Sequence, residues 1–270
     1  MHTLRRYFSN IFKGSRPWAK RAPEALTPGQ RRRVAAAFPL YERLPDAVRD
    51  RLDDLALRFA RTTRWVGRDG LAIDEAMRLT VAVQACLMIV NKPDARFRGL
   101  KTVILYPSAF ASRQARSEDG YVVTEGRDVR LGESWMRGPV VLSWPDAEHG
   151  ASVPDDGVNV VVHEFAHQLD AQTGVVDGAP LLDRDHDAGA WARTFSAAFE
   201  RLREAVKDGR ETAIDPYGAE APEEFFAVAA ELFFERPEDL QAEEPEVYAH
   251  LARYFRLDPA AWPPAPADEA

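Results

Sequence analysis

The stretch VNVVVHEFAHQLDAQTG, residues 158–174, places two histidines four positions apart within an apolar segment. The apolar residues recur at helical spacing, so the stretch predicts a helix ending near Gly174. Positions i and i+4 lie on the same helix face. His163 and His167 can therefore direct ring nitrogens at a single ion about 2 Å away.

Glu164 directly follows the first histidine and lies one step round the helix, so it can reach a water molecule on that ion. The His-Glu-x-x-His pattern is typical of zinc hydrolases: the ion lowers the pKa of the water to about 7, and the glutamate takes its proton. Two other interpretations remain: a pair of hydrogen-bonded core histidines, or a purely structural metal.

A catalytic zinc site needs a third protein ligand. We expect a carboxylate from the apolar helix APEEFFAVAAELFFE, about 221–235, either Glu223 or Glu224, and spacing alone does not choose between them. Glu231 lies seven residues after Glu224, on the same face, among apolar residues. The remaining histidines are expected to be ordinary surface residues: His2, His149, His186 and His250.

The composition of the 270 residues is that of a soluble globular protein, with 46% hydrophobic and 29% charged residues. The net charge of −8 disfavours binding to nucleic acid. Residues 1–33 nevertheless hold nine Lys and Arg against one acid, and we interpret residues 1–26 as a basic, flexible arm. No apolar run is long enough to span a membrane. The lone cysteine, Cys86, excludes an internal disulfide and favours the cytoplasm.

The pattern along the chain changes from helical to extended and back to helical. We expect helices at 46–65, at 74–90, from Asp187 to near Gly209, and at 244–255, and a capped helix start at Thr27. Short β-branched runs predict strands, namely TVILYP, YVVTEG and GPVVLSW. The predicted organisation is α+β: a helical portion at 27–69 docked on a catalytic domain at 70–257, with a disordered tail at 258–270.

HEFAHQLD followed by PYGAEAPEEFFAVAAELFF resembles the Mlc titration factor A family of bacterial zinc peptidases. Three upstream blocks also match: GLAIDEAMRLTVAVQACLMIVN, VILYPSAF and GESWMRGPVVLSW. The C-terminal part resembles the catalytic domain of anthrax lethal factor, which shares a tyrosine, a glutamate seven residues later and then Phe-Phe-Ala. The resemblance covers roughly residues 38–257.

The resemblance implies that Glu224 is the third zinc ligand and that Tyr217 steadies the oxyanion. It implies a mostly helical, zincin-like (gluzincin) fold with a small mixed sheet beside the zinc helix, whose edge strand, which we assign to 140–144, could hold a peptide. Val228 stands where thermolysin-type enzymes carry an acid, so Asp170 or Glu231 could instead orient a ligand histidine.

The function predicted from these residues is that of a zinc-dependent peptidase with one zinc per chain, and the resemblance implies that its cleavage is aminopeptidase-like. The resemblance also implies a partner for some family members, the glucose repressor Mlc. The alternative is a regulatory protein that sequesters a transcription factor and has weak or vestigial peptidase activity. A zinc hydrolase of non-peptide amides is a third reading, because the site chemistry is the same.

Overall fold

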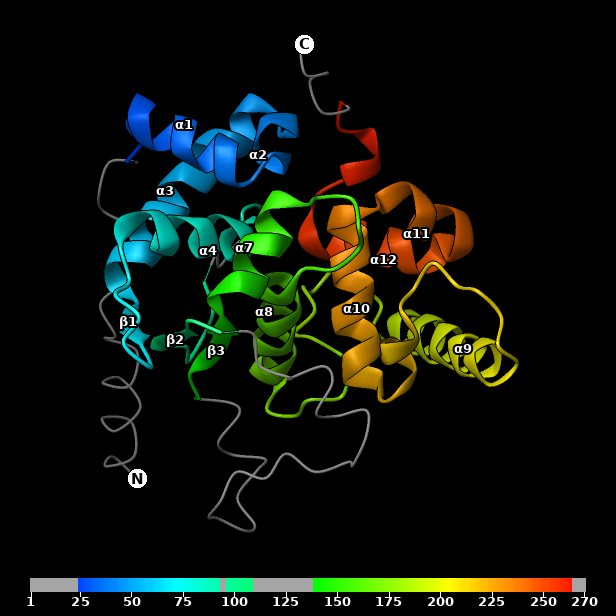
Figure 1. The fold of residues 1–270 in the computed structure, drawn as a ribbon. Coiled ribbons are helices and arrows are strands. Elements are labelled where there is room, and N and C mark those ends of the chain that lie inside the picture. Colours follow the sequence, from blue (N-terminus) through cyan, green and yellow to red (C-terminus); the bar gives the residue numbers. More distant parts are fainter. Residues whose placement is uncertain (1–23, 93–95, 109–137, 264–270) are drawn as a thin grey trace, which may run out of the picture.

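The computed structural model describes residues 24–92, 96–108 and 138–263. The described part is mostly helical with one small sheet, as α+β predicts (Figure 1). The predicted arm up to residue 23, the predicted strand at 121–126 and the tail from residue 264 lie outside the described residues.

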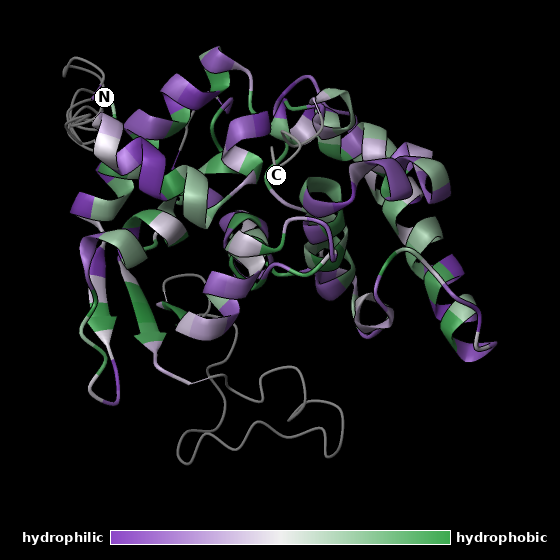
Figure 2. Cartoon of the chain, turned by 45° about the horizontal axis from the view of Figure 1, so that its top comes forward, coloured by the Kyte–Doolittle hydropathy of each residue, from purple (hydrophilic) through white to green (hydrophobic). Residues whose placement is uncertain are grey.

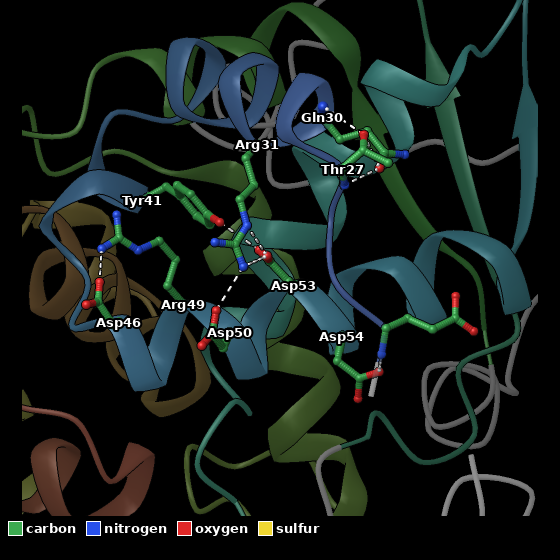
Figure 3. Close-up of polar contacts among 10 residues, drawn as sticks. Thr27, Gln30, Arg31, Tyr41, Asp46, Arg49, Asp50, Asp53 and Asp54 are labelled. Carbon is green, nitrogen blue, oxygen red and sulfur yellow. Dashed lines mark hydrogen bonds and ion pairs between the residues drawn. The ribbon is translucent and has the colours of Figure 1, made fainter. Parts of the chain in front are cut away.

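The N-terminal helices are α1 (Pro28–Ala37), α2 (Leu40–Arg43) and α3 (Asp46–Thr62). The α1 helix starts with the predicted capping box, in which Gln30 N donates to Thr27 Oγ1 and Thr27 N donates to Gln30 Oε1. A buried polar cluster joins these helices: Asp53, 0% exposed, accepts from Tyr41 Oη at 2.7 Å and from Arg31 Nε at 2.7 Å (Figure 3). This cluster fixes α1 and α2 on α3.

The central helix is α4 (Glu75–Leu87), which begins at the predicted cap, Asp74. It is buried on nearly every side and contacts α1, α3, α7 (Trp144–Ser152) and α8 (Val160–Asp170). The N-terminal helices therefore pack on the same core as the rest of the described chain. The exact domain boundaries stay predictions.

The described sheet has three strands in the order β1 (Arg64–Gly67), β2 (Thr102–Tyr106), β3 (Val140–Ser143). Both pairs are parallel, so the predicted mixed sheet is not what the described strands form. Parallel neighbours need a crossover connection, and between β1 and β2 the chain passes through α4. The two strands at the left of Figure 2 are hydrophobic over part of their length, but β1 has exposed ends, Arg64 and Gly67, whereas β2 buries the alternate residues Val103 and Leu105.

Several predicted element boundaries were wrong, among them the end of the helix expected at 74–90, which ends at Leu87. The helix at 46–65 ends at Thr62, and Arg64 begins a strand. The predicted edge strand 140–144 loses Trp144 to α7, where Ser143 is the cap and Pro145 occupies the first turn. The start of the predicted tail is ordered, because Pro259 and Trp262 are buried and Ala260 N donates to Tyr248 Oη at 3.1 Å.

The C-terminal half surrounds two packed helices, α8 and α10 (Pro222–Glu235), which lie side by side (Figure 1). Asn159 caps α8, and a short 3-10 turn, η1 (Ala171–Thr173), follows it. The remaining elements are α9 (Ala188–Lys207), η2 (Pro216–Ala219), α11 (Pro237–Glu243), α12 (Pro245–Phe255) and η3 (Pro259–Ala261). Within the described ranges, every helix is too short or too polar to cross a lipid bilayer.

Candidate metal centre

The α8 helix carries both histidines of the His-Glu-x-x-His pattern on its buried side. His163 is 5% exposed and His167 is 7% exposed, and their Nε2 atoms are 3.2 Å apart. The start of α8 is fixed by Asn159, whose Oδ1 accepts from Val162 N at 3.0 Å. The predicted one-turn spacing therefore brings two imidazoles to one point.

Glu224 comes from the first turn of α10 and completes a cluster of three ligand atoms. Its Oε2 lies 3.1 Å from His163 Nε2 and 3.4 Å from His167 Nε2. The Glu224 side chain is only 13% exposed. Glu223, the neighbouring alternative from the sequence, does not belong to this cluster of candidate metal ligands.

The three atoms have the separations that a metal ion requires. Atoms bound at about 2.0–2.1 Å to a tetrahedral ion lie roughly 3.3 Å apart, and here the separations are 3.1, 3.2 and 3.4 Å. Nitrogen and oxygen atoms that can offer lone pairs converge in this space, and one cation placed there would satisfy all three. The residues present therefore fit a divalent metal.

The electrostatics of the cluster favour positive charge. Burial lowers the pKa of His163, but hydrogen bonds with Glu224 and Glu231 outweigh burial and raise this pKa to about 10. Burial raises the pKa of Glu224, but hydrogen bonds with His163 and His167 outweigh it and hold this pKa well below its usual range. Both shifts follow from a carboxylate and imidazoles sharing one buried space.

Glu164 and Tyr217 lie at the same cluster. Glu164 is half-buried on α8, and its negative charge contributes to the raised pKa of His163. Tyr217 lies in η2, where its backbone N–H donates to Asp215 Oδ1 at 2.8 Å. The Tyr217 ring centroid is 5.9 Å from that of His163. The structure thus brings His163, His167 and Glu224 together, places the Tyr217 ring near His163, and leaves Glu164 next to His163 along α8.

Asp170 and Glu231, the two candidates for orienting a ligand imidazole, contact different partners. Glu231 Oε1 lies 2.7 Å from His163 Nδ1, within hydrogen-bonding distance. Asp170 Oδ2 instead accepts from Gly178 N at 2.8 Å, and burial raises the pKa of Asp170 to about 6. Asp170 therefore ties the loop after α8 to the helix, and Glu231 is the acid that contacts a histidine of the cluster.

The other described histidines lie outside the cluster. His149 Nε2 pairs with Asp156 Oδ2 at 2.8 Å on the surface, as expected. The His186 side chain is only 2% exposed, so the expectation of a surface residue was wrong for it. The sequence around it, DRDHDAG, is polar and gave no sign of this burial. The His250 ring packs 5.7 Å from that of Trp191.

Comparisons with known proteins agree with this chemistry. Residues 13–256 match the family described as glucose-regulated metallo-peptidase M90. The chain is 33% identical to Mlc titration factor A of Serratia proteamaculans over 248 residues, which cover 91% of this chain and 93% of that protein. It is 30% identical to Mlc titration factor A of Pectobacterium atrosepticum over 248 residues, which cover 91% and 92%.

An uncharacterized protein of Synechocystis sp. is 37% identical over 223 residues, which cover 82% of this chain and 81% of that protein. The family match and these relatives each span most of the chain, so the resemblance that its motifs suggest is confirmed. The chain belongs to the M90 family of glucose-regulated metallo-peptidases and to the Mlc titration factor A family.

Proposed function

We propose that this chain is a zinc-dependent peptidase that hydrolyses peptide bonds in an aminopeptidase-like manner. The observation that carries the proposal is the convergence of three ligand atoms, from His163, His167 and Glu224, at mutual separations of 3.1–3.4 Å. These three residues would hold one zinc ion per chain, because two imidazoles and a carboxylate form a known ligand set for catalytic zinc.

When bound, the zinc ion supplies Lewis acidity, which lowers the pKa of a water molecule to about 7 and polarises the carbonyl group to be attacked. The two histidines and Glu224 would hold that ion as its protein ligands. The nearly complete burial of both imidazoles limits competing hydrogen bonds with bulk water.

Glu164 acts as general base and then as general acid. Its carboxylate accepts a proton from the attacking water and passes it to the leaving amine. The helix supports this role, because residue 164 lies about 100° round α8 from His163, beside the ligand face and not on it. Its half-buried position leaves the carboxylate within reach of water.

Tyr217 donates its hydroxyl hydrogen to the oxyanion that forms on the substrate carbonyl. Support comes from the packing of its ring near that of His163, at a centroid distance of 5.9 Å. A peptide substrate would pair with β3, which stands at one end of the described sheet and contacts α8. Val141 of that strand is 41% exposed.

A second role is favoured by the names of the relatives, which are called titration factors for Mlc. We propose that the chain also binds a transcriptional repressor of the Mlc type. The alternative function is regulatory sequestration of such a repressor with weak or vestigial peptidase activity. The presence of Glu164 beside a complete ligand cluster favours an active enzyme.

We place either role in the cytoplasm, because the one cysteine, Cys86, is a buried free thiol.

The experiment is to compare wild type with Glu164→Gln in zinc content and in cleavage of a peptide panel. Glu164→Gln should retain about one zinc per chain and lose hydrolysis by at least about a hundredfold, the usual scale of general acid–base catalysis. Chelation of zinc should abolish the wild-type activity. Cleavage by Glu164→Gln at the wild-type rate would overturn the mechanism. Repressor capture by this variant, together with an inactive wild type, would favour the sequestration role.

A matched pair on α10 tests the third ligand. Glu224→Gln removes a carboxylate that lies 3.1 Å from His163 Nε2, whereas Glu223→Gln changes its neighbour outside the cluster. Only Glu224→Gln should lose zinc. Equal zinc retention by both variants would contradict the assignment.

A further inference from the structure

The carboxylate of Glu231 joins the cluster to the beginning of α8. Glu231 is 0% exposed and lies two turns beyond Glu224 on α10. Its Oε1 is 2.7 Å from His163 Nδ1, and its Oε2 accepts the backbone N–H of Asn159 at 2.5 Å. One buried side chain thus contacts both the imidazole and the capping residue of the same helix.

This contact decides which nitrogen of His163 carries the hydrogen. A carboxylate accepts hydrogen bonds and does not donate them, so a hydrogen bond from His163 to Glu231 places the ring hydrogen on Nδ1. In the neutral ring that a metal ligand requires, the lone pair of Nε2 then lies on the other side, 3.1 Å from Glu224 Oε2 and 3.2 Å from His167 Nε2. Nε2 is the nitrogen that a metal in this cluster would need.

Helix α10 also holds the beginning of α8. Asn159 is 1% exposed, and its Nδ2 donates to Gly150 O at 2.8 Å and to Glu235 Oε1 at 2.9 Å. Its Oδ1 accepts from Val162 N. Both the backbone and the side chain of Asn159 are therefore tied to carboxyl groups of α10, and α8 cannot rotate about its axis without breaking these bonds.

A buried carboxylate is costly to a fold unless it is offset by positive charge and hydrogen bonds. Apolar residues at this depth in α10 pack without that cost, as Phe226 and Phe233 do. The position of Glu231 is thus better explained by the imidazole that it contacts than by stability.

We propose that Glu231 is a positioning residue, which fixes the tautomer and the ring orientation of His163 and, through Asn159, the rotation of α8. The proposal rests on the proposed function, in which His163 is a metal ligand. Residues that hold a ligand histidine in this way commonly contribute about 10- to 100-fold to metal affinity.

Glu231→Gln is the sharpest change, because it preserves size and removes one acceptor. A carboxamide offers one oxygen and one NH2 group, whereas the two Glu231 oxygens face two N–H groups, on Asn159 and His163. The NH2 group then either faces the Asn159 N–H or donates to Nδ1 of His163, which moves the ring hydrogen to Nε2. The zinc dissociation constant of Glu231→Gln, measured by competition with a chelator, should rise about 10- to 100-fold.

The matched control is Asp53→Asn, which makes the same carboxylate-to-amide change at another residue with 0% exposure. Asp53 lies in the Arg31 and Tyr41 cluster of the N-terminal helices (Figure 3). This variant should lower the melting temperature and leave the zinc dissociation constant within about twofold of wild type. Equal zinc affinity of Glu231→Gln and wild type would overturn the proposal.

His163→Ala separates this proposal from the metal centre itself. Loss of zinc by His163→Ala, with wild-type affinity in Glu231→Gln, would overturn only the positioning role. Wild-type zinc affinity in His163→Ala would overturn the metal centre and the positioning role together.

If Glu231→Gln does not fold, nitrogen-15 NMR of histidine-labelled, zinc-loaded wild type gives the answer directly. The expected result is a hydrogen on His163 Nδ1 that exchanges slowly with water. A hydrogen on Nε2 would overturn the proposal.

Discussion

At the residue scale, Glu235 has a carboxyl group that the fold keeps away from water. The residue is 2% exposed, and its Oε1 accepts from Asn159 Nδ2. Burial raises the pKa of Glu235 to about 9, assisted by the negative charges of Asp156 and Glu231 and opposed by the Asn159 hydrogen bond. The folded protein therefore keeps this carboxyl protonated at neutral pH.

Glu235→Gln should stabilise the protein at alkaline pH. The unfolded chain releases the Glu235 proton near pH 4.5 and the folded protein near pH 9, so the folded state binds more protons in this window. Wild-type stability is then lost as pH rises from about 4.5 to 9. Glutamine resembles the protonated acid and does not titrate. Urea unfolding should show little difference at pH 4.5 and a gain on the order of a few kcal/mol at pH 9. A difference that does not change with pH would contradict this account.

The sequence predicts most of the candidate site because its chemistry is encoded locally. The spacing of His163 and His167 is a property of one helix turn. The third ligand lies on a different helix, far along the chain. Sequence spacing did not distinguish Glu223 from Glu224 as that ligand, and only the family resemblance pointed to Glu224. The structure adds what spacing cannot give, namely that Glu231 contacts an imidazole whereas Asp170 binds a loop.

At the element scale, the segment after α8 sets where α10 begins. Gly178 has a φ of +77°, and a Cβ added there would lie 2.4 Å from Pro222 O. Gly178 is held from two sides, because its N donates to Asp170 Oδ2 and its O accepts from Trp191 Nε1 at 3.3 Å. This close approach fixes the first turn of α10, which carries Glu224.

Gly178→Ala should therefore displace the start of α10 as well as strain the loop. Its control is Gly209→Ala, at a φ of +67° with nothing within 4 Å of the added Cβ. Both variants should lose about 1 kcal/mol from the left-handed backbone conformation. Only Gly178→Ala should lose more than this and also weaken zinc binding, by roughly tenfold, because Glu224 moves with Pro222. Equal stability and equal zinc affinity in the two variants would show that this contact does not position α10.

Prediction of the elements succeeded where caps and long apolar patterns coincide. Thr27, Asp74 and Asp187 each cap the helix that the sequence assigned to them. Prediction failed where elements are short. The four-residue β1 follows directly on a helical pattern, and the strand expected at 140–144 loses Trp144 to a helix whose first turn holds Pro145. Strand direction was not readable from the sequence, because it depends on how distant strands meet.

At the scale of the whole molecule, one hydrophobic core runs from Leu26 to Trp262. The two ends of the described chain meet the same body, since Arg43 Nε donates to Pro263 O at 2.9 Å and Trp262 is buried. The α8 and α10 helices lie inside this body and present the cluster between them. A buried, packed surrounding core suits a metal site, which needs its ligands fixed before the metal binds.

The most direct test of the central claim is anomalous diffraction at the zinc absorption edge from crystals of the zinc-loaded protein. The account predicts one peak per chain, about 2 Å from His163 Nε2, His167 Nε2 and a carboxylate oxygen of Glu224. A zinc peak elsewhere, or a peak at the histidines with the Glu224 carboxylate out of bonding distance, would contradict it.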